Sequence, residues 1–222
     1  MTALHRQLPP LYPLFGSGQG DVESLARACL EGGARLLQLR EKPPAQASSS
    51  LQEAWQKKTL HVARSLAALC RRHQALLIIN DRADWVIPSQ AHGVHLGQDD
   101  LSPQRARRLL GEKAIIGYST HNQEQFAAAQ DLPVDYLALG PIFRSPTKPG
   151  ANPPLGLERL QTLCAASRLP VVAIGGINLQ RALRVWEAGA ASIAVISDIA
   201  GHPDPSARVR SYLQAYRRLR RA

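Results

Sequence analysis

The chain has 222 residues, of which 45% are hydrophobic and 20% are charged, and these proportions exclude a disordered or low-complexity protein. Its apolar stretches are far shorter than the roughly 20 residues that span a bilayer, and no secretory signal is visible, so we expect a cytoplasmic protein with no membrane partner. The formal net charge of +10 is unusual, and it suggests a partner that is either nucleic acid or a small anion.

Short apolar runs alternate with longer amphipathic ones along the whole chain. The expected strands are Leu11–Phe15, Leu36–Leu39, Leu76–Ile79, Val94–Leu96, Ile115–Tyr118, Tyr136–Gly140, Val171–Ile174 and Ile193–Ile196. The expected helices are Asp21–Glu31, Leu51–His73, Ala83–Ile87, Pro103–Leu110, Gln123–Gln130, Gly156–Ala166, Leu179–Ala188 and Ala207–Arg221. Eight strand–helix units predict an α/β protein with a single (β/α)8 TIM barrel, and an open doubly wound sheet is the alternative.

No shift in composition marks a linker, so we expect one barrel domain over residues 1–222. Two parts lie outside the regular pattern: a polar extension near residues 43–58 and a basic C-terminal tail at residues 217–222. The tail holds four arginines and is typical of a solvated helix end. The three cysteines, Cys29, Cys70 and Cys164, are odd in number and far apart, which is typical of free thiols in a reducing compartment.

Polar residues follow seven consecutive predicted strands, where a barrel of this kind carries its active site. In strand order they are Gln38, Arg40 and Lys42; Asn80 and Asp81; Gln98, Asp99 and Asp100; Ser119, Thr120 and His121; Ser145, Thr147 and Lys148; Gly175 and Gly176; Ser197 and Asp198. Agreement across seven loops is a stronger signal than any one loop.

Two kinds of chemistry follow from these loops. Asn80-Asp81 alone could be a plain Asx turn, but with a carboxylate from Asp99 or Asp100 it predicts a Mg²⁺ site, since Mg²⁺ prefers oxygen ligands and often bridges phosphates. Gly175-Gly176 and Ile196-Ser197 lie where barrels bind phosphate through backbone N–H groups. Ser145, Thr147 and Lys148 add hydroxyl donors and a cation.

The histidines separate into two groups. His92 and His95 fall on opposite faces of a strand, so we interpret both as structural rather than as metal ligands. His121 differs because it follows a strand beside Ser119, and it is a candidate site residue.

Seven segments in order give the chain a specific resemblance from Leu11 to about Ile199. They are Gln38–Lys42, Asn80–Asp84, Gly93–Asp100, Gly117–His121, Gly140–Phe143, Thr147-Lys148 and Ala173–Ile177. The chain resembles the thiamine-phosphate synthase (thiamine-phosphate pyrophosphorylase) family. That family has the (β/α)8 barrel fold, and its members are transferases that join a pyrimidine to a thiazole with Mg²⁺ as cofactor.

The resemblance also implies roles for individual residues. The substrate 4-amino-2-methyl-5-(diphosphooxymethyl)pyrimidine would bind through Gln38, Arg40, Lys42, Asn80, Ser119 and Lys148. Among these, Arg40, Lys42, Lys148 and Ser119 would act in catalysis, and Mg²⁺ would bind Asp81 and Asp100. The thiazole phosphate would bind Ser145, Thr147, Gly176, Ile196 and Ser197. Diphosphate would leave dissociatively, and the thiazole nitrogen would capture the resulting cation.

The chain departs from the family pattern in three places. Ser145 stands where the family usually has Thr, no Asp follows the opening strand, and the stretch between Lys42 and Asn80 is several residues longer than usual.

Two other functions remain open. A related thiazole tautomerase would use a histidine in the position of His121 as its acid–base group, but it would not need Asp81 and Asp100. A non-catalytic barrel could instead bind nucleic acid through its arginines, although no nucleic-acid-binding motif accompanies them. We expect phosphorylated small molecules and no nucleic acid as partners, and the sequence leaves a homo-oligomer open.

Overall fold

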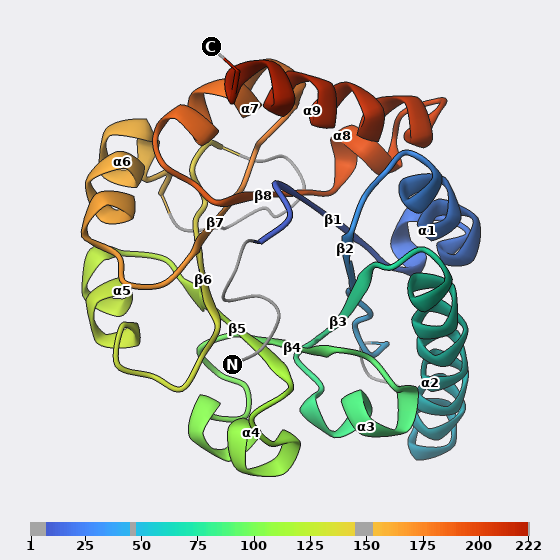
Figure 1. The fold of residues 1–222 in the computed structure, drawn as a ribbon. Helices are drawn as coiled ribbons and strands as arrows, with labels where there is room; N and C mark the ends of the chain where they lie inside the picture. Colours follow the sequence, from blue (N-terminus) through green and yellow to red (C-terminus); the bar gives the residue numbers. More distant parts are fainter. Residues whose placement is uncertain (1–7, 45–47, 145–152, 222) are drawn as a thin grey trace.

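The structure is a computed structural model that describes residues 8–44, 48–144 and 153–221. Eight parallel strands pair in chain order and close into a barrel, and helices surround it (Figure 1). The strands are β1 Leu11–Phe15, β2 Leu36–Leu39, β3 Leu76–Asn80, β4 Gly93–Leu96, β5 Ile115–Thr120, β6 Tyr136–Leu139, β7 Val171–Ile174 and β8 Ser192–Val195. The predicted (β/α)8 barrel is therefore confirmed, and the open doubly wound alternative is wrong because β1 also pairs with β8.

The helices form an outer ring around these strands. They are α1 Val22–Glu31, α2 Ser49–Arg72, α3 Val86–Ser89, α4 Pro103–Leu110, α5 Gln123–Ala129, α6 Gly156–Ala166, α7 Leu179–Glu187, α8 Ser197–Ala200 and α9 Pro205–Leu219. Two 3₁₀ turns, Ser17–Gln19 and Ala83–Trp85, lie between regular elements. Helix α9 packs against both α7 and α1 and closes the ring (Figure 1).

Most predicted boundaries agree with the structure within two residues. The expected helix Ala83–Ile87 is instead a 3₁₀ turn followed by α3, which contains Pro88. Proline fits there because the N–H it lacks would have no partner in the first turn of a helix. Helix α9 begins at Pro205 rather than at Ala207, after an Asp204 cap whose carboxylate accepts from the Ala207 N–H. The four-residue α8 was not predicted.

The irregular segments join regular helices. Helix α2 begins at Ser49, so much of the polar extension near residues 43–58 is its exposed first half, while residues 45–47 lie outside the described part of the chain. Arg217 and Arg218 of the basic tail form the last turn of α9, where cations interact favourably with the helix dipole. Among the described residues, no helix is both long and apolar enough to cross a membrane.

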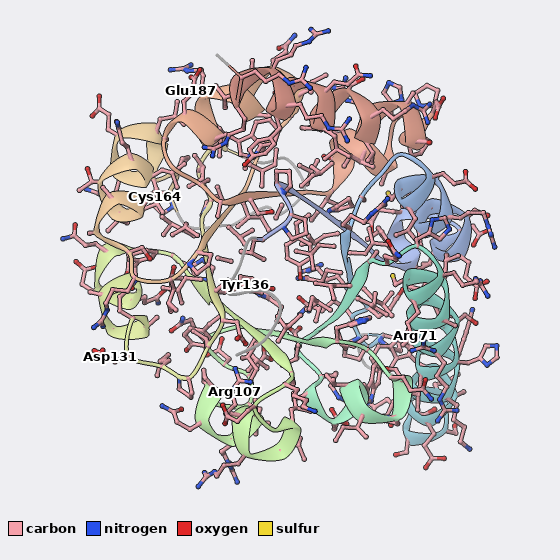
Figure 2. The ribbon with its side chains drawn as sticks, viewed as in Figure 1. Arg71, Arg107, Asp131, Tyr136, Cys164 and Glu187 are labelled. Carbon is pink, nitrogen blue, oxygen red and sulfur yellow. The ribbon has the colours of Figure 1, made fainter. Side chains whose placement is uncertain are left out.

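The alternation of side chains along each strand produces two separate apolar layers. Outward residues pack against the helices, and inward residues fill the barrel. The inward set includes Tyr12, Leu14, Leu36, Ile78, Ile115, Tyr136, Ala138, Val172 and Ala194. Figure 2 shows Tyr136 inside the barrel, while Arg107, Asp131 and Glu187 lie on its outer ring. The packed barrel leaves its open end, at the carboxyl ends of the strands, for polar groups.

Candidate active site

A cavity of about 1160 Å³ lies at the carboxyl ends of the strands. The site residues predicted from the sequence that line it are Gln38, Arg40, Lys42, Asn80, Asp81, Asp100, Ser119, His121, Gly175, Gly176, Ile196 and Ser197. Ser145, Thr147 and Lys148 lie outside the described residues. The structure therefore brings together residues from strands that are as far apart in sequence as β2 and β8.

Two carboxylates and a lysine occupy one side of the cavity. Lys42 Nζ lies 2.5 Å from Asp81 Oδ2, and Asp100 Oδ2 accepts from the Gly97 N–H at 2.7 Å. Burial, together with the neighbouring Asp81 carboxylate, raises the pKa of Asp100. The residue pattern alone leaves open whether Asp99 or Asp100 is a ligand, and the family resemblance implies Asp100. In the structure the Asp100 carboxyl interacts with that of Asp81. Two adjacent carboxylates repel each other, and a cation between them would relieve that repulsion.

The carboxylates of Asp81 and Asp100 suit Mg²⁺ better than they suit a metal that is held by protein ligands alone. Among the residues that the structure describes, no cluster of three or more His, Cys, Asp or Glu side chains could enclose an ion. Mg²⁺ usually binds one or two carboxylates and fills its other positions with water and substrate phosphate. Asp81 and Asp100 could hold Mg²⁺ in this way.

The floor of the cavity carries two amide side chains with unused hydrogen-bonding atoms. Gln38 and Asn80 are 2% and 7% exposed. Among the described residues, Gln38 Oε1 and Asn80 Nδ2 are buried without a hydrogen-bond partner. A buried polar atom without a partner costs about 1–3 kcal/mol, so both atoms favour a ligand that supplies one donor and one acceptor.

His95 belongs to the site, although its place in the strand pattern predicts only a structural role. It lines the cavity, and its ring nitrogens lie 2.8 Å from Ser119 Oγ and 3.0 Å from the Tyr136 hydroxyl. Burial lowers the pKa of His95 to about 4, so the ring is neutral near pH 7. His92 does have the predicted structural role, because its Nδ1 accepts from the Leu77 N–H.

His121 reaches the cavity in one defined tautomer. Its Nδ1 lies 2.9 Å from the Gly140 carbonyl oxygen. Since a carbonyl only accepts, Nδ1 carries the proton and Nε2 of a neutral ring is left as an acceptor.

The opposite side of the cavity is built by the diglycine turn after β7. Gly175 and Gly176 have φ values of +102° and +61°, and a Cβ on Gly176 would lie 2.5 Å from the Arg144 carbonyl oxygen. These positions therefore require glycine both for conformation and for space. Arg181 donates to the Gly176 carbonyl oxygen at 2.6 Å and lies over the Phe143 ring. Sequence reasoning missed Arg144 and Arg181, which line the cavity from a loop and a helix rather than directly after a strand.

Asp198 anchors this side of the site. Its carboxylate accepts two hydrogen bonds from Arg208, at 2.8 and 2.9 Å, and another from the Tyr212 hydroxyl. It also accepts from the Leu179 N–H at the start of α7. The pKa of Asp198 is lowered, because the bonds from Arg208 and Tyr212 outweigh the effect of burial. One carboxylate thus ties α7, α8 and α9 together beside the diglycine turn.

A closed parallel barrel with a polar cavity at the carboxyl ends of its strands is the architecture of a TIM-barrel enzyme. Comparison with known sequences gives the particular family, since the profile described as thiamine monophosphate synthase matches residues 11–199. The chain belongs to the thiamine monophosphate synthase family.

Individual relatives agree with this assignment. The chain is 43% identical over 217 residues to the thiamine-phosphate synthase of Thioalkalivibrio sulfidiphilus, covering 95% of this chain and 96% of that protein. It is 42% identical over 196 residues to the thiamine biosynthesis bifunctional protein ThiM/ThiE of Symbiobacterium thermophilum, of which it spans 38%. A solved thiamine phosphate pyrophosphorylase from Pyrococcus furiosus superposes with a TM-score of 0.83 at 28% identity, over 95% of this chain and 96% of that one.

Proposed function

We propose that the chain is a thiamine-phosphate synthase that joins the pyrimidine diphosphate to a thiazole phosphate and releases diphosphate. The observation that carries the proposal is one cavity of about 1160 Å³ that is lined both by carboxylates beside cationic side chains and by a diglycine turn. The carboxylates with Lys42 and Arg40 face the diglycine turn across this space, as a reaction between two phosphorylated substrates requires.

The pyrimidine diphosphate would bind on the side of β2 to β5. The buried Gln38 Oε1 and Asn80 Nδ2 offer an acceptor and a donor, which suits the amino group and phosphate oxygens of this substrate. Asp81 and Asp100 would hold Mg²⁺, which supplies charge neutralisation at the diphosphate when it is bound. Asp99 lines the same rim of the cavity, and we assign it no ligand role.

The bond between the methylene carbon and the diphosphate oxygen then breaks, and the oxygen keeps the electron pair. Arg40, Lys42 and Lys148 stabilise the negative charge that develops on the diphosphate, and Ser119 donates to the same group. The aminopyrimidine ring spreads the positive charge of the methylene cation. This step needs no protein nucleophile.

The thiazole phosphate would bind at Ser145, Thr147, Gly176, Ile196 and Ser197, and its ring nitrogen would then face the pyrimidine side. The nitrogen lone pair forms the new bond to the methylene carbon, and a carboxylated thiazole then loses carbon dioxide. A dry, closed site would protect the cation from water until capture. We place this chemistry in the cytoplasm, where the free thiols Cys29, Cys70 and Cys164 stay reduced.

The thiazole tautomerase is a second candidate, because His121 presents Nε2 as an acceptor to the same cavity. Proton NMR of purified protein distinguishes the two functions. Thiazole phosphate alone should remain unchanged, and thiamine phosphate should form only when the pyrimidine diphosphate and Mg²⁺ are added. Isomerisation of the thiazole without synthesis would overturn the proposed function.

A further inference from the structure

A row of hydrogen-bonded side chains crosses the interior of the barrel just beneath the cavity. Gln38 Nε2 donates to the Tyr12 hydroxyl at 2.8 Å, and this hydroxyl lies 3.1 Å from that of Tyr136. The Tyr136 hydroxyl lies 3.0 Å from His95 Nδ1, and His95 Nε2 lies 2.8 Å from Ser119 Oγ. The row joins β2, β1, β6, β4 and β5, and it connects two residues of the proposed pyrimidine site, Gln38 and Ser119.

The proton positions along this row follow from the donor at one end. The Gln38 amide nitrogen only donates, so the Tyr12 hydroxyl accepts from it. Tyr12 is buried and its other hydroxyl partner is Tyr136, so we infer that it gives its own hydrogen to Tyr136. Tyr136 in turn gives its hydrogen to Nδ1 of His95. The imidazole proton therefore resides on Nε2 and is donated to Ser119 Oγ. The hydrogen of the Ser119 hydroxyl is then free to point into the cavity.

The surroundings hold this arrangement in place. Tyr12 and Tyr136 are 1% and 0% exposed, and their rings meet edge to face at 6.1 Å. His95 stacks on Tyr136 with ring centroids 5.6 Å apart. Both ring nitrogens of His95 face hydroxyl groups and not carboxylates, so the buried ring is neutral. A Cβ at Gly117 would overlap Cζ of Tyr136, so this glycine provides the space that the Tyr136 ring occupies.

We propose that Tyr12, Tyr136 and His95 are positioning residues that orient the two ends of this row toward the pyrimidine diphosphate. At one end Gln38 is held with its carbonyl oxygen free to accept from the amino group of the ring. At the other end Ser119 is held as a donor to the substrate. The unpartnered, buried Gln38 Oε1 is the second observation that indicates a ligand. The proposal rests on the proposed function for the identity of that ligand.

The tautomer of His95 tests the direction of the row without any substrate. In ¹⁵N-histidine-labelled full-length protein, long-range ¹H–¹⁵N spectra distinguish the two neutral tautomers, and His95→Gln assigns the signal. We expect the Nε2–H form. An Nδ1–H form would reverse the hydrogen bonds between Tyr12, Tyr136, His95 and Ser119, would direct the Ser119 hydrogen to Nε2 instead of the cavity, and would overturn the proposal.

Substrate binding tests what the row does. Tyr136→Phe keeps the ring packing and removes the hydroxyl in the middle of the row, and Tyr216→Phe on the outer helix α9 is the matched control. By calorimetry we expect Tyr136→Phe to weaken binding of the pyrimidine diphosphate about tenfold, with thiazole phosphate binding unchanged within about twofold. His95→Gln retains an N–H near Nε2 and should weaken binding less than His95→Leu does.

The outcomes separate the proposal from the proposed function. Wild-type protein that does not bind the pyrimidine diphosphate would overturn the proposed function and the ligand assigned to the row. A correctly folded Tyr136→Phe variant that binds it as tightly as wild-type protein would overturn the positioning role alone. An equal loss for both substrates would assign Tyr136 a general structural role and also overturn the proposal.

Discussion

Asp81 has a backbone conformation that is rare outside glycine, with φ of +65°. Its N–H donates to the His95 carbonyl oxygen at 2.8 Å, which fixes the turn at the end of β3. This turn directs the Asp81 carboxylate toward Lys42 and Asp100. The unusual conformation is therefore tied to the place where the metal is proposed to bind.

The substitution Asp81→Asn removes the negative charge without disturbing the backbone, because asparagine also tolerates positive φ. We expect Asp81→Asn and Asp100→Asn each to lower the Mg²⁺-dependent rate of thiamine phosphate formation by at least about 100-fold. Both variants should fold normally, as circular dichroism would show. We expect Lys148→Ala to lower the same rate by a comparable factor. Near wild-type rates in either aspartate variant would rule out the proposed metal ligands.

Gly117 is a second position where one residue controls the site. Because a Cβ there would clash with the Tyr136 ring, we expect Gly117→Ala to destabilise the protein by about 1–3 kcal/mol. Gly18→Ala is the matched control, because a Cβ there meets no atom within 4 Å. Urea unfolding midpoints measure both changes. Equal midpoints for the two variants would mean that the Tyr136 ring moves aside at no cost.

At the scale of the element, Asp198 holds three helices together through hydrogen bonds to Arg208, Tyr212 and the start of α7. We expect Asp198→Asn to lower the free energy of unfolding by about 1–2 kcal/mol at pH 7. Asp131→Asn is the control, since its pair with Arg168 is exposed and should contribute little.

The pH dependence of this effect has a definite sign. The pKa of Asp198 is lowered in the folded state, since the bonds from Arg208 and Tyr212 outweigh burial. Its contribution is therefore complete above the ordinary aspartate pKa of about 4 and is lost as the pH falls through the folded value. The difference between wild type and Asp198→Asn should shrink below about pH 4 in denaturant titrations. A difference that grows on acidification would contradict this account.

The strands could be predicted from sequence because each is a short apolar run buried on both faces, as in Val171–Ile174. The loops of the site could also be predicted, since the closed barrel brings every strand end to one mouth. Helix α8 has only four residues and shows no periodicity. The role of His95 depends on Tyr136, 41 residues away, and strand pattern alone could not connect the two.

For the molecule as a whole, the basic residues that give the net charge of +10 lie in different places and have different roles. Arg40 and Lys42 line the cavity, and Arg107 is nearly buried, where it pairs with Asp135 at 2.8 Å. Arg217 and Arg218 end α9 on the outer ring of helices. The overall charge therefore gives no reason by itself to expect nucleic-acid binding.

Replacement of the four C-terminal arginines by Gln tests whether they contribute to activity or to nucleic-acid binding. These residues are Arg217, Arg218, Arg220 and Arg221. We expect kcat/KM for thiamine phosphate formation to stay within about twofold, because none of the four arginines lines the cavity and the helix propensity of Gln is close to that of Arg. Gel shifts at rising salt should show weak, salt-sensitive binding of nucleic acid at most. Tight binding that survives physiological salt would instead favour a nucleic-acid partner.

We propose that one cavity holds two phosphorylated substrates and Mg²⁺ while the substrates are joined. The direct measurement is the simultaneous assay of thiamine phosphate and diphosphate from purified protein, with each substrate and the metal omitted in turn. We expect equal amounts of both products in the complete mixture and neither product when any component is omitted. Diphosphate release without thiamine phosphate, or synthesis that persists in a chelator, would contradict the proposal.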